Sequence, residues 1–200
     1  MVYKVNGKID SVYDVVDLFG WATSGYGDFS PALISTNPQH YPLKFEAKDI
    51  VGTNYDWGYN AISNGGNQSG LWRVLSADEW NYLFNGRENA ANLYAQAMID
   101  SIEGMILLPD GCNVPSDIAF TTTILGWETN KYTFEEWKKL EALGAVFLPV
   151  AGDRSGKSVA SIGFIAYYWT GSCDGGDYAH YYVFNEKEQY PAENGRSRWF

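Results

Sequence analysis

The last fifth of the chain, residues 163–200, constrains the fold most, because aromatic side chains are concentrated there. Aromatic residues are 16% of the whole chain, yet these 38 residues hold eleven of them: Phe164, Tyr167, Tyr168, Trp169, Tyr178, Tyr181, Tyr182, Phe184, Tyr190, Trp199 and Phe200. Two runs typical of strands, 165–170 and 178–184, flank the turn-rich segment 171–177. The pattern predicts an antiparallel pair of strands joined by a loop.

Alternation along these strands predicts which aromatic side chains share a face, because successive strand residues point to opposite sides of a sheet. The aromatic residues divide into two sets, with Tyr168, Tyr182 and Phe184 on one face and Tyr167, Trp169 and Tyr181 on the other. A pair that is aromatic on both faces buries one side and offers the other for contact. Tyrosine suits a recognition surface, since its rigid ring gives contact area and its hydroxyl gives a hydrogen bond. Core and cross-strand packing is the alternative explanation for many of these residues.

Length and charge exclude several classes of function. A chain of 200 residues with 46% hydrophobic and 19% charged residues predicts one compact domain. The net charge of -10 and the scattered basic residues argue against nucleic acid and anionic membranes as partners. No apolar run approaches the roughly 18–20 residues of a membrane span. The first residues lack the basic and apolar regions of a signal peptide, so either the protein is not exported by that route or the leader is not part of this sequence.

The clearest local signal in the first half of the chain is a helix start at Ser76. Glu79 follows three residues later and completes a capping box. We therefore expect a strand or extended entry over 71–75 and a helix over 77–85. Its buried stripe would consist of Trp80, Leu83 and Phe84, which lie three and four residues apart.

A second capping box, formed by Thr133 and Glu136, predicts a helix that runs to about residue 143. Gly144 supplies the left-handed stop, and the run AVFLPV after it is expected to be a strand. The side chains expected to face the core are Phe134, Trp137, Leu140 and Leu143.

The other segments carry weaker signals. We expect a strand over 2–5, a short helix or turn over 12–19, an irregular ordered loop over 25–70, a mixed helix or loop over 88–103, and a buried strand over 104–110 that ends at Pro109. Helices would then dominate the first three quarters and strands the end. This order indicates an α+β fold class.

Several phrases of the chain resemble one family when they are read together. They are DLFGWATSG (17–25), DIVGTNYDWGYNAISNGGNQSGLWRVLSADEWNYLF (49–84), ILLPD (106–110), YTFEEWKKLEALGAVFLP (132–149), AGDRSGKSV (151–159) and YYWTGS (167–172). In this order they are similar to the variable proteins of gut bacteria and phages that diversity-generating retroelements diversify. The resemblance spans most of the chain, although related chains begin with a longer strand-forming segment and continue beyond the final Phe into a short apolar strand.

This resemblance implies a single C-type lectin-like domain over 1–200, in which two helices surround small antiparallel sheets with long ordered loops. It implies a non-catalytic, receptor- or adhesin-like protein without metal or cofactor. The partner would be a macromolecule, protein or glycan, on the surface of another cell, and the location a virion or a bacterial cell surface. The C-terminal region 163–200 would be the ligand-binding region, rewritten by adenine-directed mutagenic reverse transcription.

Carried over residue by residue, the resemblance separates fixed from rewritten positions. The expected scaffold residues are Gly163, Tyr168, Trp169, Ala179, Phe184, Pro191 and Arg196. The expected variable, solvent-facing and ligand-binding residues are Phe164, Ile165, Tyr167, Asp174, Asp177, Tyr178, His180, Tyr181, Glu186, Glu188, Gln189 and Glu193. Exposed aromatic side chains among carboxylates and an amide suit such a surface.

Catalytic alternatives find little support in the residues. Formylglycine-generating enzymes share the general fold and hold copper with two nearby cysteines, but only Cys173 lies in the C-terminal region here. Cys173 with His180 is the one combination of nucleophile and base, across a predicted loop. Cys112 and Cys173 have no metal-ligand spacing, and we expect two separate thiols more readily than a disulfide. His40 and His180 have no neighbouring His or Cys for a zinc site.

Carbohydrate binding, either independent of calcium or dependent on it, is a further alternative. The Glu-Pro-Asn and Trp-Asn-Asp sequences of sugar-binding C-type lectins are absent. Asp174 with Asp177, or the stretch 110–117, offers carboxylates, but a solvated loop is the simpler reading of both. The segment 152–158 ends in Gly-Lys-Ser, yet Ala151 stands where a phosphate-binding loop needs its first glycine.

Overall fold

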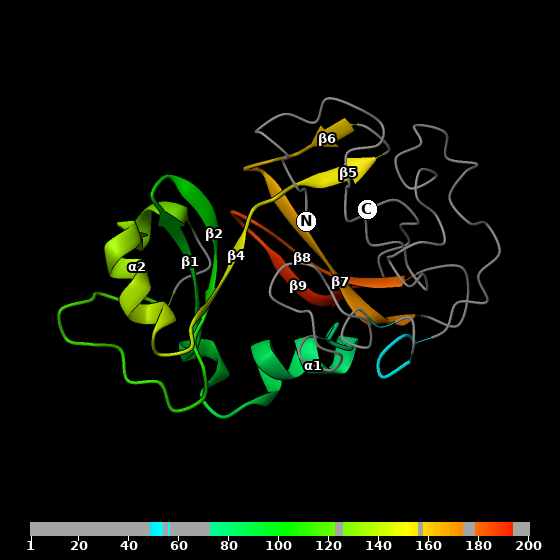
Figure 1. Ribbon diagram of the computed structural model, residues 1–200, viewed down its shortest axis with the longest axis horizontal. Coiled ribbons are helices and arrows are strands. Elements are labelled where there is room, and N and C mark those ends of the chain that lie inside the picture. Colours follow the sequence, from blue (N-terminus) through cyan, green and yellow to red (C-terminus); the bar gives the residue numbers. More distant parts are fainter. Residues whose placement is uncertain are drawn as a thin grey trace.

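The fold is α+β, and the computed structural model describes residues 49–53, 56, 73–122, 126–155, 158–173 and 179–193. Figure 1 shows helix α2 on one side of a four-stranded sheet and a three-stranded sheet on the other. Two short α-helices lie in the described part of the chain, α1 (Ala77–Asn81) and α2 (Phe134–Glu141). The expected fold class is therefore confirmed at the level of α+β.

The four-stranded sheet has the order β3-β1-β2-β4. Its strands are β1 (Tyr94–Ile99), β2 (Ile102–Leu107), β3 (Lys131–Tyr132) and β4 (Val146–Pro149). β2 pairs antiparallel with both β1 and β4, and β3 pairs parallel with β1. The expected strands in 104–110 and after Gly144 are thus confirmed, but strands also fill the middle of the chain, where we expected mostly helices.

The hairpin of β1 and β2 corrects the expectation of a mixed helix or loop over 88–103. Only Ala90–Asn92 forms a short 3-10 helix, and β1 begins two residues later. The turn between the strands is Asp100-Ser101, with positive φ angles of 44° and 71°. Two-residue hairpin turns need such angles and usually have Gly or Asn there, so this Asp-Ser turn carries little signal in the sequence.

Helix α2 starts as its capping box predicts. The Glu136 N–H donates to Thr133 Oγ1 at 3.3 Å, and the Thr133 N–H donates to Glu136 Oε2 at 2.8 Å. Gly144 has φ 91° and ends the last turn, as expected. Trp137 and Leu140 are buried against the four-stranded sheet.

Two residues that we expected in the core under α2 are exposed instead. Phe134 is the first residue of the helix, is 50% exposed, and carries the Lys138 ammonium 4.7 Å above its ring. Leu143 lies beyond the helix and is 41% exposed. The prediction applied the helical spacing to residues at both ends of the helix. A helix this short buries only the residues in its middle, so the end residues remain exposed.

The helix after Ser76 is shorter than expected as an α-helix. α1 is followed directly by the π-helical turn Tyr82–Gly86, so the helical segment covers the predicted range. Trp80 and Phe84 are buried and Leu83 packs beside them, which confirms the expected stripe.

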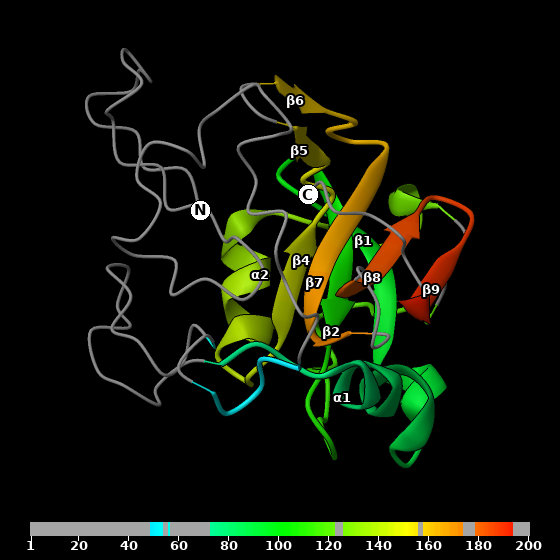
Figure 2. The same ribbon diagram turned by 90° about the vertical axis from the view of Figure 1, so that its right-hand side faces the viewer.

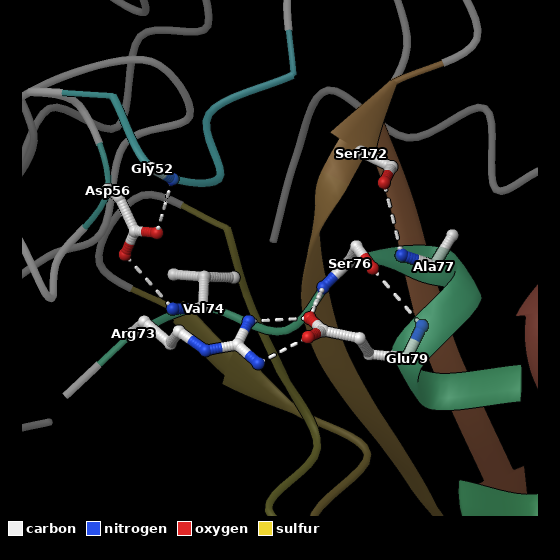
Figure 3. A network of polar contacts seen from close by, with 8 residues as sticks. All are labelled: Gly52, Asp56, Arg73, Val74, Ser76, Ala77, Glu79 and Ser172. Carbon is white, nitrogen blue, oxygen red and sulfur yellow. Dashed lines mark hydrogen bonds and ion pairs between the residues drawn. The ribbon is translucent and has the colours of Figure 1, made fainter. Parts of the chain in front are cut away.

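A network of polar contacts fastens the start of α1 to two distant segments (Figure 3). The carboxylate of Asp56, which is 1% exposed, accepts from the N–H of Gly52 at 3.1 Å and of Val74 at 3.0 Å. Ser172 Oγ accepts from the Ala77 N–H at 3.1 Å. These bonds join Gly52 and Asp56, residues 74–77 and the end of the C-terminal sheet into one unit.

Glu79 makes this unit sensitive to acid. Arg73 Nη1 donates to Glu79 Oε2 at 2.6 Å, and the Ser76 N–H donates to the same oxygen at 2.9 Å. The hydrogen bond from Arg73, helped by that from Ser76, lowers the pKa of Glu79 to about 2. A carboxylate with a lowered pKa in the folded state stabilises the fold above its unfolded value of about 4.3, and this contribution disappears as the pH falls from there toward 2.

We therefore expect the free energy of unfolding to fall between about pH 4.5 and pH 2, and to fall less steeply in Glu79→Gln. Because both side chains are partly exposed, the difference should stay near 1 kcal/mol. Urea unfolding at a series of pH values measures it. Glu186→Gln removes a carboxylate from an exposed turn and serves as control; an identical change in slope in that variant contradicts the assignment to Glu79.

The C-terminal sheet has three antiparallel strands, β7 (Ile165–Cys173), β8 (Ala179–Asn185) and β9 (Gln189–Glu193). Figure 2 shows them side by side, with α1 below. The predicted strand pair is confirmed, with β7 extending three residues into the expected loop. The strands β5 (Asp153–Ser155) and β6 (Ser158–Ala160) pair antiparallel before β7.

The main core lies between the two sheets and is largely aromatic. Tyr182 and Phe184 of β8 are fully buried, and the Tyr182 ring stacks on Trp80 and Phe84 with centroids 4.9 and 4.5 Å apart. A second core lies between α2 and the other face of the four-stranded sheet. Gln96 of β1, also fully buried, donates from Nε2 to the carbonyl of Asn185 at 2.7 Å and so links the two sheets.

Some expectations lie outside the described residues. They concern the strand over 2–5, the helix or turn over 12–19, most of the loop over 25–70, the first two residues of the strand or entry over 71–75, and His40, Asp174, Asp177, Tyr178 and Arg196. None of the helices within the described ranges is both long and apolar enough to cross a membrane.

Candidate ligand-binding face

The register of β7 and β8 separates the C-terminal sheet into two faces. Ala166 lies opposite Phe184 and Tyr168 opposite Tyr182, and these residues point to the core. Tyr167 lies opposite Val183 and Trp169 opposite Tyr181, so their side chains point the other way. The predicted division of the aromatic residues into two sets is confirmed.

We call the side away from the core the outer face. Its residues in the described strands are Ile165, Tyr167, Trp169, Tyr181, Val183, Asn185 and Tyr190. Tyr190 joins it because it pairs with Val183 and is 39% exposed. Tyr167, Trp169 and Tyr181 are half-buried.

Three rings of the outer face pack edge to face. Tyr181 makes T-shaped contacts with Tyr167, at 5.3 Å between centroids and 78° between planes, and with Trp169, at 6.4 Å and 80°. Perpendicular packing brings the positive edge of one ring toward the negative face of another. Each ring is therefore oriented by its neighbours and would lose little freedom in a further contact.

A carboxylate lies beside this aromatic group. Gly152 forms a parallel bridge with Ala166, and its N–H donates to the Ile165 carbonyl at 3.0 Å. The following residues, Asp153 and Tyr167, are therefore neighbours on the opposite side of the sheet from Ala166. Partial burial raises the pKa of the Tyr167 hydroxyl, and the negative charge of Asp153 raises it further.

The turn that leads into β7 presents two apolar side chains to solvent. Phe164 is 80% exposed and Ile162 is 63% exposed. Backbone hydrogen bonds fix the turn: the N–H groups of Phe164 and Ile165 both donate to the Ser161 carbonyl, at 3.0 and 3.2 Å. Ser161 and Gly163 have positive φ angles of 61° and 78°. Phe164, an expected contact residue, thus sits on a well-defined turn at one end of the sheet.

Acidic residues occupy the turn between β8 and β9. Glu186 and Glu188 are exposed, as expected, with Lys187 between them. Asn185 Oδ1 accepts from the N–H groups of Lys187 and Glu188 at 2.8 and 3.0 Å, which orders the turn. Glu193 pairs with Tyr181 across β8 and β9.

The expectation of a solvent-facing position does not hold for His180 and Gln189. Alternation along β8 puts His180 on the side of Tyr182, and its Nδ1 is buried without a hydrogen-bond partner. Gln189 pairs with Phe184 and accepts from the Tyr182 hydroxyl at 3.2 Å. Both residues belong to the core side of the sheet, which alternation from Tyr181 already indicated for His180.

Two other residues lie on the outer face although they were not expected to contact a ligand. Trp169 was expected as a fixed scaffold residue, but it lies half-buried on the outer face beside Tyr181, among the expected contact residues. Tyr190 was not among the expected contact residues. A bulge shifts the pairing of β8 with β9 between Tyr181 and Val183, so alternation alone does not reveal on which face Tyr190 lies.

The described residues do not bring together Cys173 with His180 or Cys112 with Cys173, the pairs considered for the catalytic alternatives. Cys173 pairs with Ala179, so alternation sets His180 on the opposite face from Cys173. Cys112 and Cys173 are both free thiols. Asp110 and Asp117 form ion pairs with Arg87 and Lys139, at 3.2 and 2.6 Å, and no group of three potential metal ligands occurs in these ranges.

The three comparisons with known proteins gave no match. No protein-family model fits the chain, and no curated protein or solved structure is significantly similar to it. The interpretation of the outer face therefore depends on its own geometry and on the resemblance of the sequence phrases.

Proposed function

We propose that the protein is a non-catalytic, receptor- or adhesin-like protein that binds a macromolecule on another cell through the outer face of the C-terminal sheet. In this proposal the domain has a C-type lectin fold, and a diversity-generating retroelement rewrites its C-terminal region. The partner is a surface protein or glycan, and no cofactor takes part.

The single observation that carries the proposal is the separation of the aromatic residues by register. One set, with Tyr182 and Phe184, is fully buried and holds the sheet to the core. The other set, with Tyr167, Trp169 and Tyr181, is half-buried and points away from it. Aromatic side chains on a rigid strand pair, with polar and acidic groups around them, are the composition of interface anchors.

Sequencing the 3′ end of the gene across a population tests the diversification. The register sharpens the expected result: codons for outer-face residues such as Tyr167 and Tyr181 vary, whereas codons for the core residues Tyr182 and Phe184 do not. A near-copy of the segment and a reverse transcriptase gene are expected nearby. Variation spread evenly over both faces, or an invariant segment, contradicts the proposal.

Substitution tests the binding role separately. Tyr181→Ala and Tyr167→Ala are expected to weaken capture of whole target cells by the immobilised protein, and to shift the melting temperature by only a few degrees. Tyr190→Ala, on the same face but next to the edge of the sheet, is expected to weaken it less. Unchanged capture by all three variants would show that the ligand binds elsewhere.

A further inference from the structure

The outer face combines aromatic rings with negative charge at one place, where β5 meets β7. Tyr181 is perpendicular to both Tyr167 and Trp169, with centroids 5.3 and 6.4 Å away. Asp153 follows the bridge of Gly152 with Ala166 and is the neighbour of Tyr167. We refer to Asp153, Tyr167, Trp169 and Tyr181 as the aromatic–acidic cluster.

We propose that the aromatic–acidic cluster binds a cationic side chain, arginine or lysine, of a protein partner. This inference rests on the proposed function and specifies the chemistry of the ligand at the same face. It selects a protein over a glycan as the partner.

The ring geometry favours a cation. The face of an aromatic ring is negative, and a cation within about 6 Å of the ring centroid is attracted to it. Where two rings are perpendicular, a cation in the corner between them lies over the face of one ring and beside the face of the other. Both rings then attract it. Half-burial of the rings strengthens the attraction, because less water screens it.

The negative charges near the cluster also favour a positively charged ligand. Asp153 offers a carboxylate to an ammonium or guanidinium group beside Tyr167. The whole chain has a net charge of -10, and Glu186 and Glu188 are exposed in the turn between β8 and β9. This field attracts basic partners and repels acidic glycans and phosphates.

The surroundings of the cluster favour a protein over a small ammonium compound. The same sheet carries Tyr190 on its third strand and the exposed Phe164 at the entry to β7. Protein interfaces combine a few anchor residues with a wider apolar and polar surface of this kind. A small cation bound at the cluster would not reach Tyr190 and Phe164, whereas a protein partner could contact them as well.

The test uses the whole chain and two peptides that differ only in charge. Acetylated, amidated hexa-arginine is titrated against the protein by calorimetry at low salt, and hexa-citrulline, its neutral analogue of similar shape, is the control. We expect the citrulline peptide to bind at least about tenfold more weakly. Equal binding of both peptides overturns the cation proposal but leaves an aromatic binding face intact, and so does an absence of binding by both.

Matched variants then locate the site. Asp153→Asn and Tyr181→Ala are each expected to weaken hexa-arginine binding by about fivefold or more, whereas Glu141→Gln, which removes the same charge from the exposed end of α2, changes it less than about twofold. Circular dichroism confirms that each variant is folded. Equal effects of Asp153→Asn and Glu141→Gln indicate diffuse attraction and overturn the proposal.

A third titration separates the two sources of a cation. Tetramethylammonium is expected to bind at least about tenfold more weakly than hexa-arginine, since it meets only the rings. Equal or tighter binding of tetramethylammonium identifies a site for small quaternary ammonium groups and overturns the choice of a protein partner. Binding of hexa-arginine that is unaffected by Tyr181→Ala argues against the outer face itself, and hence against the proposed function.

Discussion

Replacing Tyr182 by Ala is expected to lower the free energy of unfolding by about 3–5 kcal/mol. The side chain is fully buried, and its ring stacks on Trp80 and Phe84 between the helical segment and the sheet. Truncation removes these contacts and opens a cavity in the main core. Chemical unfolding with urea, followed by circular dichroism, measures the loss.

The neighbouring residue provides the control for this prediction. Tyr181→Ala removes the same atoms from the same strand, but from the outer face, and is expected to cost about 1 kcal/mol through the loss of ring contacts such as those with Tyr167 and Trp169. Tyr182→Phe keeps the ring and removes only the hydroxyl that donates to Gln189, at a cost of about 1 kcal/mol. Equal losses for Tyr181→Ala and Tyr182→Ala would mean that the assignment of the two faces is wrong.

Features that depend on neighbouring residues were predictable from the sequence. Both capping boxes, at Ser76 and Thr133, form as their spacing predicts, because the bonds join residues three apart. The division of β7 and β8 into two aromatic faces follows from alternation alone. The left-handed stop at Gly144 likewise depends on one residue and its conformation.

Features that depend on distant residues were not predictable. Asp56 can be buried because its carboxylate accepts a hydrogen bond from the N–H of Val74, eighteen residues away. Arg87, which is 6% exposed, is satisfied by the carbonyl groups of Leu83, Leu93 and Leu108. The periodicity of the sequence predicts the burial of neither residue, because a charged residue is expected at the surface unless its hydrogen-bond partners are known.

The candidate site shows the same limit. Alternation identified Tyr167 and Tyr181, but the acidic member of the cluster, Asp153, comes from a different strand pair. The bridge that brings it to Tyr167 depends on the close approach of Gly152 to the backbone of residues 160–162. In the sequence, the segment 152–158 was considered as a phosphate-binding loop, and nothing there marked Asp153 as a neighbour of Tyr167.

Gly152→Ala is therefore expected to affect stability and binding together. Gly152 has φ 74°, and a Cβ atom there would lie 2.0 Å from the carbonyl oxygen of Ala160 and 2.7 Å from the nitrogen of Ile162. Backbone atoms cannot yield as a flexible side chain can, so either β5 or the turn before β7 must move. We expect a loss of at least about 3 kcal/mol in the free energy of unfolding, together with weaker binding of hexa-arginine, because Asp153 is displaced.

Gly144→Ala separates the clash from the backbone conformation. Gly144 also has a positive φ, 91°, but a Cβ atom there would meet only Pro109 Cγ, at an ordinary 3.6 Å. In this variant only the left-handed conformation is unfavourable, so the free energy of unfolding is expected to fall by about 1–2 kcal/mol. Its affinity for hexa-arginine is expected to stay the same. If the two variants lose equal stability and bind alike, the cost at Gly152 is conformational only, and the close contact of β5 with the turn does not position Asp153. A larger loss in Gly152→Ala, accompanied by weaker binding, makes that contact the link between the fold of the C-terminal sheet and the charge beside its aromatic face.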